Sequence, residues 1–291
     1  MQLADLGLLA LTIPESDGGI GAGAIGAMLV SNAVGEGLLL EPFHASAIVA
    51  TQVIVQLATA AQRETWLPSM ASGETIAVLA HDDAVRGVGV EATPAGDGWI
   101  LSGTKHGVYH GDIADLLLVS ARIKGSGALA LFALPAGADG VTRQGYRTVD
   151  DQRAASLAFE NVSVRADARL GEDVAAGLQL AIDFGLAGLC AEAVGALDRI
   201  LAATIDYSRQ RSQFGVPIGS FQALQHRMAD MLMYVEQARS MSYLATSRCT
   251  DADAAVRRTA LAAAKVSIGQ AARFVSQQAV QIHGGVCLTI N

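Results

Sequence analysis

The chain has few cysteines, few aromatic residues and few charged side chains. Its 291 residues include three cysteines, 5% aromatic residues and 16% charged residues. Cys190, Cys249 and Cys287 lie far apart with no CxxC pair, which argues against a disulfide framework and a zinc site. Lys and Arg total 20 against 28 Asp and Glu, a net charge of −8, and this balance argues against a nucleic-acid-binding function.

Targeting and membrane signals are also absent from the sequence pattern. The first residues lack the basic segment that opens a signal peptide. Apolar runs are interrupted by Asp, Glu, Arg or Gly, so none forms the uninterrupted span of ~20 residues that a membrane helix needs. We therefore expect a cytoplasmic protein without a membrane span. The 51% hydrophobic residues are then assigned to a large core and to subunit interfaces.

Three stretches differ in their hydrophobic pattern. Residues 1–75 read as helices separated by short breaks, with a helix near 61–67 that ends close to Pro68. Residues 76–168 contain short runs of strand length between Gly-, Asp- and Pro-bearing turns, which is typical of a small antiparallel barrel or sandwich. Residues 169–291 return to helical periodicity. The predicted fold class is mainly α with a central small β-domain.

The third stretch contains long helices. Apolar residues recur at helical spacing in two runs, and a third helix is expected from Asp253 toward Gln281, where Gly284-Gly285 can stop it. The two runs comprise Leu189, Ala193, Leu197, Ile200 and Thr204, and then Leu224, Met228, Met231, Val235 and Ala238. Met228, Met231 and Met233 are interpreted as core packing.

Two motifs with a clear order along the chain carry a family resemblance. Residues 207–231, YSRQRSQFGVPIGSFQALQHRMADM, resemble the paired-helix segment of the acyl-CoA dehydrogenase family, and Gln281-Ile282-His283-Gly284-Gly285 resembles its flavin loop. Weaker matches are PESDGGI at 14–20 and GWILSGTK at 98–105. The order of helices, β-domain and helices also resembles this family, and shorter bacterial members in particular.

The resemblance implies FAD as cofactor and assigns residues to it. Arg211 would pair with the pyrophosphate, for which its fixed charge and planar donors are suited. Phe214 would pack on the flavin nucleotide, and Gln222 would bond nearby. Gln281, Gly284 and Gly285 would allow close backbone approach. The Arg211 and Gln281 loops are expected from different subunits, so the resemblance implies a dimer or larger oligomer.

The chain also departs from the family pattern. The segment Ala80–Gly87 matches a flavin and substrate loop poorly, and Gly107 stands where an aromatic residue usually covers the flavin. Gly185 stands at one of two positions for the catalytic glutamate, and the chain stops at Asn291 before the other. Asp183 is interpreted as a helix cap or dipole partner rather than as the base. No catalytic residue is assigned, and the chain reads as truncated at both ends.

The resemblance implies α,β-dehydrogenation of a CoA thioester, with bulky or steroid-derived acyl groups as candidates, in fatty acid or steroid catabolism. Two alternatives remain open. One is a non-catalytic subunit that completes the FAD site of an unlike chain. The other is a flavin-dependent monooxygenase of the same fold.

Other motifs receive plain structural interpretations. Gly21–Gly26 matches GxGxxG, but no βαβ pattern follows, so we expect a helix start rather than a dinucleotide site. His106, His110 and Asp112 are expected to be polar turn residues, and no metal site is predicted. His226 is interpreted as a residue that hydrogen-bonds between helices.

Overall fold

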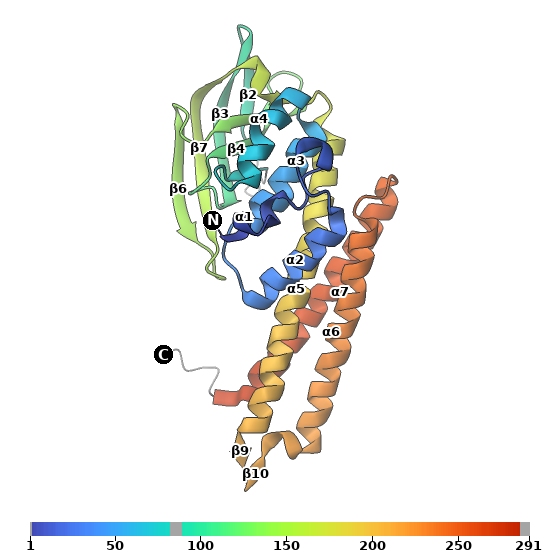
Figure 1. Cartoon of the computed structure of the whole chain (residues 1–291). Helices are drawn as coiled ribbons and strands as arrows, with labels where there is room; N and C mark the ends of the chain where they lie inside the picture. Colours follow the sequence, from blue (N-terminus) through green and yellow to red (C-terminus); the bar gives the residue numbers. More distant parts are fainter. Residues whose placement is uncertain (1, 82–88, 286–291) are drawn as a thin grey trace. The chain divides into compact units, whose positions relative to one another are not determined.

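The computed structural model describes residues 2–81 and 89–285 (Figure 1). The chain divides into a first unit, Met1–Ala27 with Leu40–Gly185, and a second unit, Met28–Leu39 with Leu186–Asn291. Helices α2 and α5 each begin in the first unit and end in the second. The predicted division into residues 1–75, 76–168 and 169–291 stays a prediction.

The start of the chain is helical, as expected. Its elements are α1 (Gln2–Asp5), η1 (Leu8–Ala10), η2 (Glu15–Asp17), α2 (Gly23–Gly37), the π-helix η3 (Phe43–Ala50), α3 (Thr51–Leu57) and α4 (Ala60–Ala71). Thr59 begins α4 with a reciprocal capping box, in which Gln62 N–H donates to Thr59 Oγ1 and Thr59 N–H donates to Gln62 Oε1. The helix continues past Pro68 to Ala71, so the predicted stop at the proline is wrong. Proline removes one N–H donor, and buried Leu67 and Met70 hold the last turn against the core.

The middle of the chain forms a curled sheet. Its described strands follow the order β6-β7-β3-β2-β4-β5-β8, and β1 also pairs with β4. Most pairs are antiparallel, as predicted, but β1 and β2 both pair parallel with β4. The strands are β1 (Ala77–Ala80), β2 (Glu91–Ala95), β3 (Gly98–Tyr109), β4 (Leu116–Ile123), β5 (Leu129–Pro135), β6 (Val141–Arg147), β7 (Arg153–Val164) and β8 (Arg169–Leu170), and η4 (Ala166–Ala168) lies between β7 and β8.

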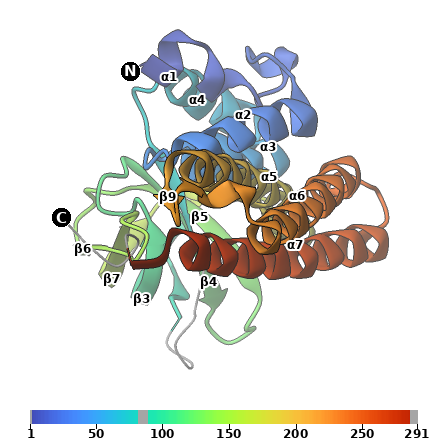
Figure 2. The ribbon, with the colours of Figure 1, turned by 90° about the horizontal axis from the view of Figure 1, so that it is seen from below.

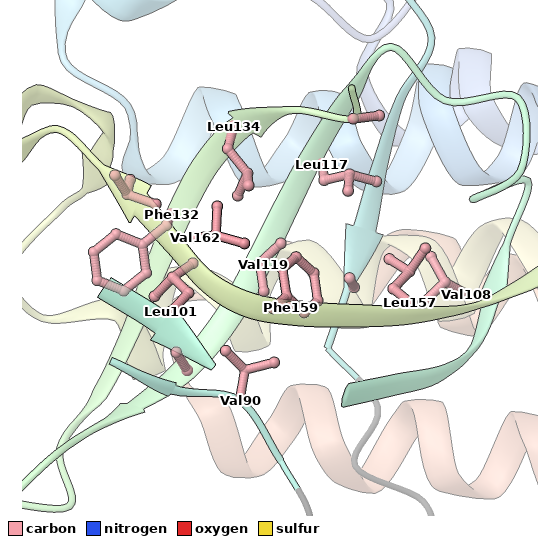
Figure 3. Close-up of a cluster of buried hydrophobic side chains, with 14 of the residues drawn as sticks. Val90, Leu101, Val108, Leu117, Val119, Phe132, Leu134, Leu157, Phe159 and Val162 are labelled. Atoms are coloured by element: carbon pink, nitrogen blue, oxygen red, sulfur yellow. The ribbon is translucent and has the colours of Figure 1, made fainter. Parts of the chain in front are cut away.

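Both faces of β4 and β5 are buried. Alternate residues such as Leu117 and Val119 point into a core that also contains Leu101 of β3 and Phe159 of β7 (Figure 3). Their neighbours Leu116 and Leu118 belong to a second core with residues of α3, α4 and the start of α5. Strand β2 pairs with both β3 and β4, so the sheet can fold over its own core at this strand.

The second unit is built from long helices. It contains most of α5 (Val174–Gln210), then α6 (Gln222–Arg248) and α7 (Ala254–His283), and α6 and α7 run side by side (Figure 2). Tyr234 stacks on Phe274 with ring centroids 4.2 Å apart. Arg239 Nη2 donates to Asp198 Oδ1 at 2.6 Å and so joins α6 to α5.

The ends of α7 confirm the sequence prediction. Asp253 is its N-cap, and its carboxylate accepts hydrogen bonds from the N–H groups of Ala255 and Val256. Gly284 is the C-cap, with φ of 60° and ψ of −141°, a conformation that favours glycine.

One predicted core residue is exposed. Met233 is 62% exposed, so its interpretation as core packing is wrong for the single chain, and Leu189 of the first helical run is also 46% exposed. Met231 and Leu197, by contrast, are buried. The helical period predicts which residues share one face of a helix, but it does not predict how much of that face other elements bury.

Within the described residues, one helix passes the length and composition test for a membrane span. In α5, an 18-residue window has a mean hydropathy of 1.7, and 56% of that window is buried inside the protein. Asp183 and Glu192 interrupt the apolar residues of α5, so this result does not contradict the expectation of no uninterrupted apolar span, and the absence of a membrane span stays a prediction. The same test is also passed by core helices of soluble proteins.

Candidate functional site

A tight hairpin follows the end of α5. Strands β9 (Ser212–Gln213) and β10 (Val216–Pro217) pair antiparallel around Phe214 and Gly215. Both loop residues have positive φ, 55° and 82°, as the two-residue type I′ turn requires. A phenylalanine in this region costs about 1 kcal/mol, so the hairpin holds Phe214 in a strained position.

The hairpin presents an exposed apolar ring and an exposed cation. Phe214 is 93% exposed, and its ring meets the edge of Phe221 at a centroid distance of 6.2 Å. Arg211 is also exposed, and within the described residues no carboxylate pairs with its guanidinium. Burying the Phe214 ring against a ligand would contribute about 1.5–3 kcal/mol.

The end of α7 lies beside the end of α5 in the same chain. Tyr207 Oη donates to the His283 carbonyl oxygen at 3.3 Å, and the two rings meet with centroids 4.4 Å apart. Residues 281, 284 and 285 are exposed. One chain thus brings the Arg211 hairpin and the last turn of α7, which contains Gln281, to the same end of the second unit (Figure 1). A second subunit is therefore not needed to bring these two segments together. The dimer that was inferred from placing them on different subunits stays a proposal.

The start of α6 adds hydrogen-bond donors to this end. Gln222 is its first residue and is exposed, and Phe221 supplies no side-chain cap. The short η5 (Ile218–Ser220) connects the hairpin to this helix. The first N–H groups of a helix have no intrahelical acceptor and form the positive end of its dipole. Together with Arg211, this helix start suits an anionic group.

The first unit contains a separate, partly open cavity of about 250 Å³. Its wall is mostly apolar but contains imidazole rings, and it is formed by η3, β1, β3 and the first part of α5. The lining residues are His44, Ala45, Val49, Leu79, His81, His106, Gly107, Val108, Tyr109 and Ile182. Gly107 thus opens part of the wall where an aromatic side chain would fill it.

A buried lysine holds the backbone of His81, one of the residues that line the cavity. Lys105 is 1% exposed, and its Nζ donates to Ser120 Oγ at 3.0 Å and to the His81 carbonyl oxygen at 3.2 Å. His81 Nδ1 lies 3.0 Å from the same Ser120 Oγ. Apart from Ala80 and His81, the segment Ala80–Gly87 lies outside the described residues.

The positions considered for a catalytic carboxylate give no base in the described part of the cavity. A Cβ at Gly185 would lie 2.7 Å from Val49 Cγ2, so the helix packs too closely for a side chain there without movement. Asp183 is buried, and its Oδ1 accepts a hydrogen bond from Gln179 Nε2 at 2.8 Å. It lies in the third turn of α5, so its interpretation as a helix-start residue is wrong.

The three residues weighed as a metal site have separate roles. His106 Nδ1 lies 3.1 Å from Ser156 Oγ, and Asp112 pairs with Arg153 at 2.8 Å. His110 is buried with φ of 56°. Within residues 2–81 and 89–285, no cluster of three His, Cys, Asp or Glu residues could hold a metal ion.

Comparison with known proteins defines the class. The family described as "Acyl-CoA dehydrogenase, N-terminal domain" matches residues 1–74, and "Acyl-CoA dehydrogenase, C-terminal domain" matches residues 178–290. The chain belongs to the acyl-CoA dehydrogenase family, whose members are oxidoreductases acting on CH–CH bonds and bind FAD.

One curated relative and two solved structures resemble this chain over nearly its whole length. The acyl-CoA dehydrogenase FadE27 of Mycobacterium tuberculosis is 32% identical over 98% of this chain and 77% of its own length. A variant of the steroid ACAD Tcur3481-Tcur3483 has a TM-score of 0.86 at 30% identity, over 98% of this chain and 76% of that one. The ChsE4-ChsE5 complex from Mycobacterium tuberculosis has a TM-score of 0.83 at 30% identity, over 99% of this chain and 77% of that one.

Sequence reasoning missed His44, the imidazole that lines the cavity from η3. The available signal was a lone histidine in the stretch 43–50, whose other residues are apolar except for Ser46. That pattern also fits a core histidine, so it could not show that the ring borders a cavity.

Proposed function

We propose that this chain binds FAD through the end of its second unit and takes part in α,β-dehydrogenation of a CoA thioester. The observation that carries the proposal is the exposed Arg211–Phe214 hairpin beside the Gln281–Gly285 turn, in a member of a family that binds FAD. The chemistry of these residues suits FAD. A guanidinium and free helix N–H groups suit a pyrophosphate, and an exposed ring suits an aromatic base.

Each residue has a distinct part in holding the cofactor. Arg211 would bind the pyrophosphate, and Gln222 and Gln281 would supply amide hydrogen bonds. Gly284 would keep the backbone open for close approach. When bound, FAD supplies the acceptor for the hydride that leaves the β-carbon of the thioester. The chain's own residues then position the two reactants and exclude water.

The acyl group is proposed to be bulky or steroid-derived. Support comes from the 30% identity to a protein named as a steroid ACAD. Removal of the α-proton requires a base, and oxyanion stabilisation must accompany it.

A second candidate function is a partner subunit that completes the FAD site of an unlike chain and leaves the base to that chain. Gly185 packed on Val49 favours it, as does the absence of Asp or Glu among the described residues lining the cavity. The ChsE4-ChsE5 complex pairs two differently named chains, and it matches this chain at a TM-score of 0.83.

The visible spectrum of the purified chain, alone and co-expressed with its genomic neighbour, tests both functions. Flavin bands in the chain alone, bleached by an acyl-CoA, support a self-sufficient enzyme. Flavin only after co-expression supports the partner subunit. Flavin in neither preparation contradicts the cofactor assignment. Arg211→Gln should lower flavin content at least tenfold, whereas Arg209→Gln, which removes a nearby cation paired with Asp206, should not.

A further inference from the structure

His44 has one enclosed and one accessible ring nitrogen. It lies in the second position of η3 and lines the cavity of the first unit. Its Nδ1 is fully buried and has no hydrogen-bond partner. Nε2 also has no hydrogen-bond partner within the described residues, but unlike Nδ1 it is not fully buried. His44 lines the cavity, and Nε2 is the ring nitrogen that solvent can reach.

The surroundings of His44 keep the imidazole neutral. Burial, helped by the neighbouring His110, lowers the pKa of His44 to about 4. Burial also lowers the pKa of His110, so neither ring supplies a charge near neutral pH. A neutral imidazole has one N–H donor and one lone-pair acceptor.

The burial of Nδ1 selects the tautomer. A buried N–H without an acceptor is rarer in proteins than an unsatisfied acceptor, because its desolvation is not compensated. The proton therefore belongs on Nε2. Both Nε2 and Cε1 lie 3.8 Å from where a Cβ of Gly185 would stand, so this edge of the ring points toward α5.

We propose that His44 Nε2 donates a hydrogen bond to an acceptor oxygen of the bound acyl group, so that the cavity selects acyl chains carrying a carbonyl or hydroxyl oxygen over plain hydrocarbon chains. This inference rests on the proposed function, since it assumes that a CoA thioester places its acyl group in this cavity. His44 is then a specificity-determining residue. A cavity of about 250 Å³ has room for a short chain or for part of a larger ring system.

Other polar groups of the wall are less suited to this role. His106 is exposed, so water competes for its ring nitrogens. Tyr109 is 51% exposed, so its hydroxyl competes with water. A partly buried donor such as His44 Nε2 discriminates more strongly between acyl groups with and without an acceptor oxygen, because leaving the donor unpaired costs about 1–3 kcal/mol.

The test compares matched ligands on matched variants. Affinities of the FAD-loaded protein for hexanoyl-CoA, 5-oxohexanoyl-CoA and 6-hydroxyhexanoyl-CoA are measured by calorimetry. We expect the wild type to bind one of the oxygenated thioesters about tenfold more tightly than hexanoyl-CoA. His44→Phe keeps the ring shape and should abolish the preference, whereas His226→Phe, at an exposed position on α6, should retain it.

Two results would overturn the inference while leaving the proposed function intact. One is binding of all three thioesters with equal affinity, and the other is an unchanged preference in His44→Phe. Failure of every thioester to bind the FAD-loaded protein would overturn both the inference and the proposed substrate class.

A ligand-free measurement tests the tautomer directly. Nitrogen-15 NMR of the imidazoles, with the His44 signals assigned by their loss in His44→Phe, should show a neutral ring protonated at Nε2. Protonation at Nδ1 would contradict the proposed donor, whether or not the protein binds a thioester.

Discussion

The buried His44 imidazole should make the protein sensitive to mild acid. Burial lowers the pKa of His44 from 6.5 to about 4, so between these pH values the unfolded chain binds a proton that the native chain does not. The stabilising effect is fully present above about pH 6.5 and is lost as the pH falls toward 4. At about 1.4 kcal/mol for each pH unit, the loss amounts to at most about 3 kcal/mol.

The perturbation is His44→Gln, which removes the titrating group and keeps a polar side chain. Urea unfolding at pH 7 and pH 4.5 gives the free energy of unfolding for the wild type and the variant. We expect the wild type to lose about 2–3 kcal/mol more than the variant between these conditions. Carboxylates that titrate below this range affect both proteins equally and cancel in the comparison.

A control variant separates His44 from other histidines. His226 is exposed on α6, so His226→Gln should leave the wild-type pH dependence unchanged. An equal loss of stability in the wild type and in His44→Gln would refute the reasoning, because the ring would then be protonated as easily in the native protein as in the unfolded one.

Further predictions concern the second unit. Phe214→Gly should relieve the positive φ and stabilise the chain by about 1 kcal/mol in urea unfolding, while flavin retention on gel filtration falls. Gly195→Ala should destabilise by about 2–3 kcal/mol, since its Cβ would lie 1.9 Å from the Asn32 carbonyl oxygen; Gly269→Ala, with nothing within 4 Å, should not destabilise the protein. Asp253→Ala should lower the thermal midpoint through loss of the α7 N-cap, worth about 1 kcal/mol.

Much of the fold follows from local pattern. Strands at 98–109, 116–123 and 129–135 were predictable because apolar residues of strand length lie between turn residues. The start and end of α7 followed from an Asp and a Gly at capping positions. The continuation of α4 past Pro68 was not predictable in this way, since packing of Leu67 and Met70 outweighed a local breaker.

The candidate site was predictable in its residues but not in its arrangement. Arg211, Phe214 and Gln281 were recognisable from motif order, yet Arg211 and Gln281 lie 70 residues apart in the chain. Only the contact between Tyr207 and His283 shows that one chain brings them to one end. Their role in FAD binding stays a prediction.

By itself the sequence determined the helical and β segments, the capping residues, the family and the motifs assigned to the cofactor, because each depends on residues close together in the chain. Only the tertiary structure decided that β1 and β2 pair parallel with β4, that Gly195 packs on the Asn32 backbone and that His44 borders a cavity. These features depend on contacts between distant segments, and burial, which sets the protonation of His44, exists only after those segments have packed.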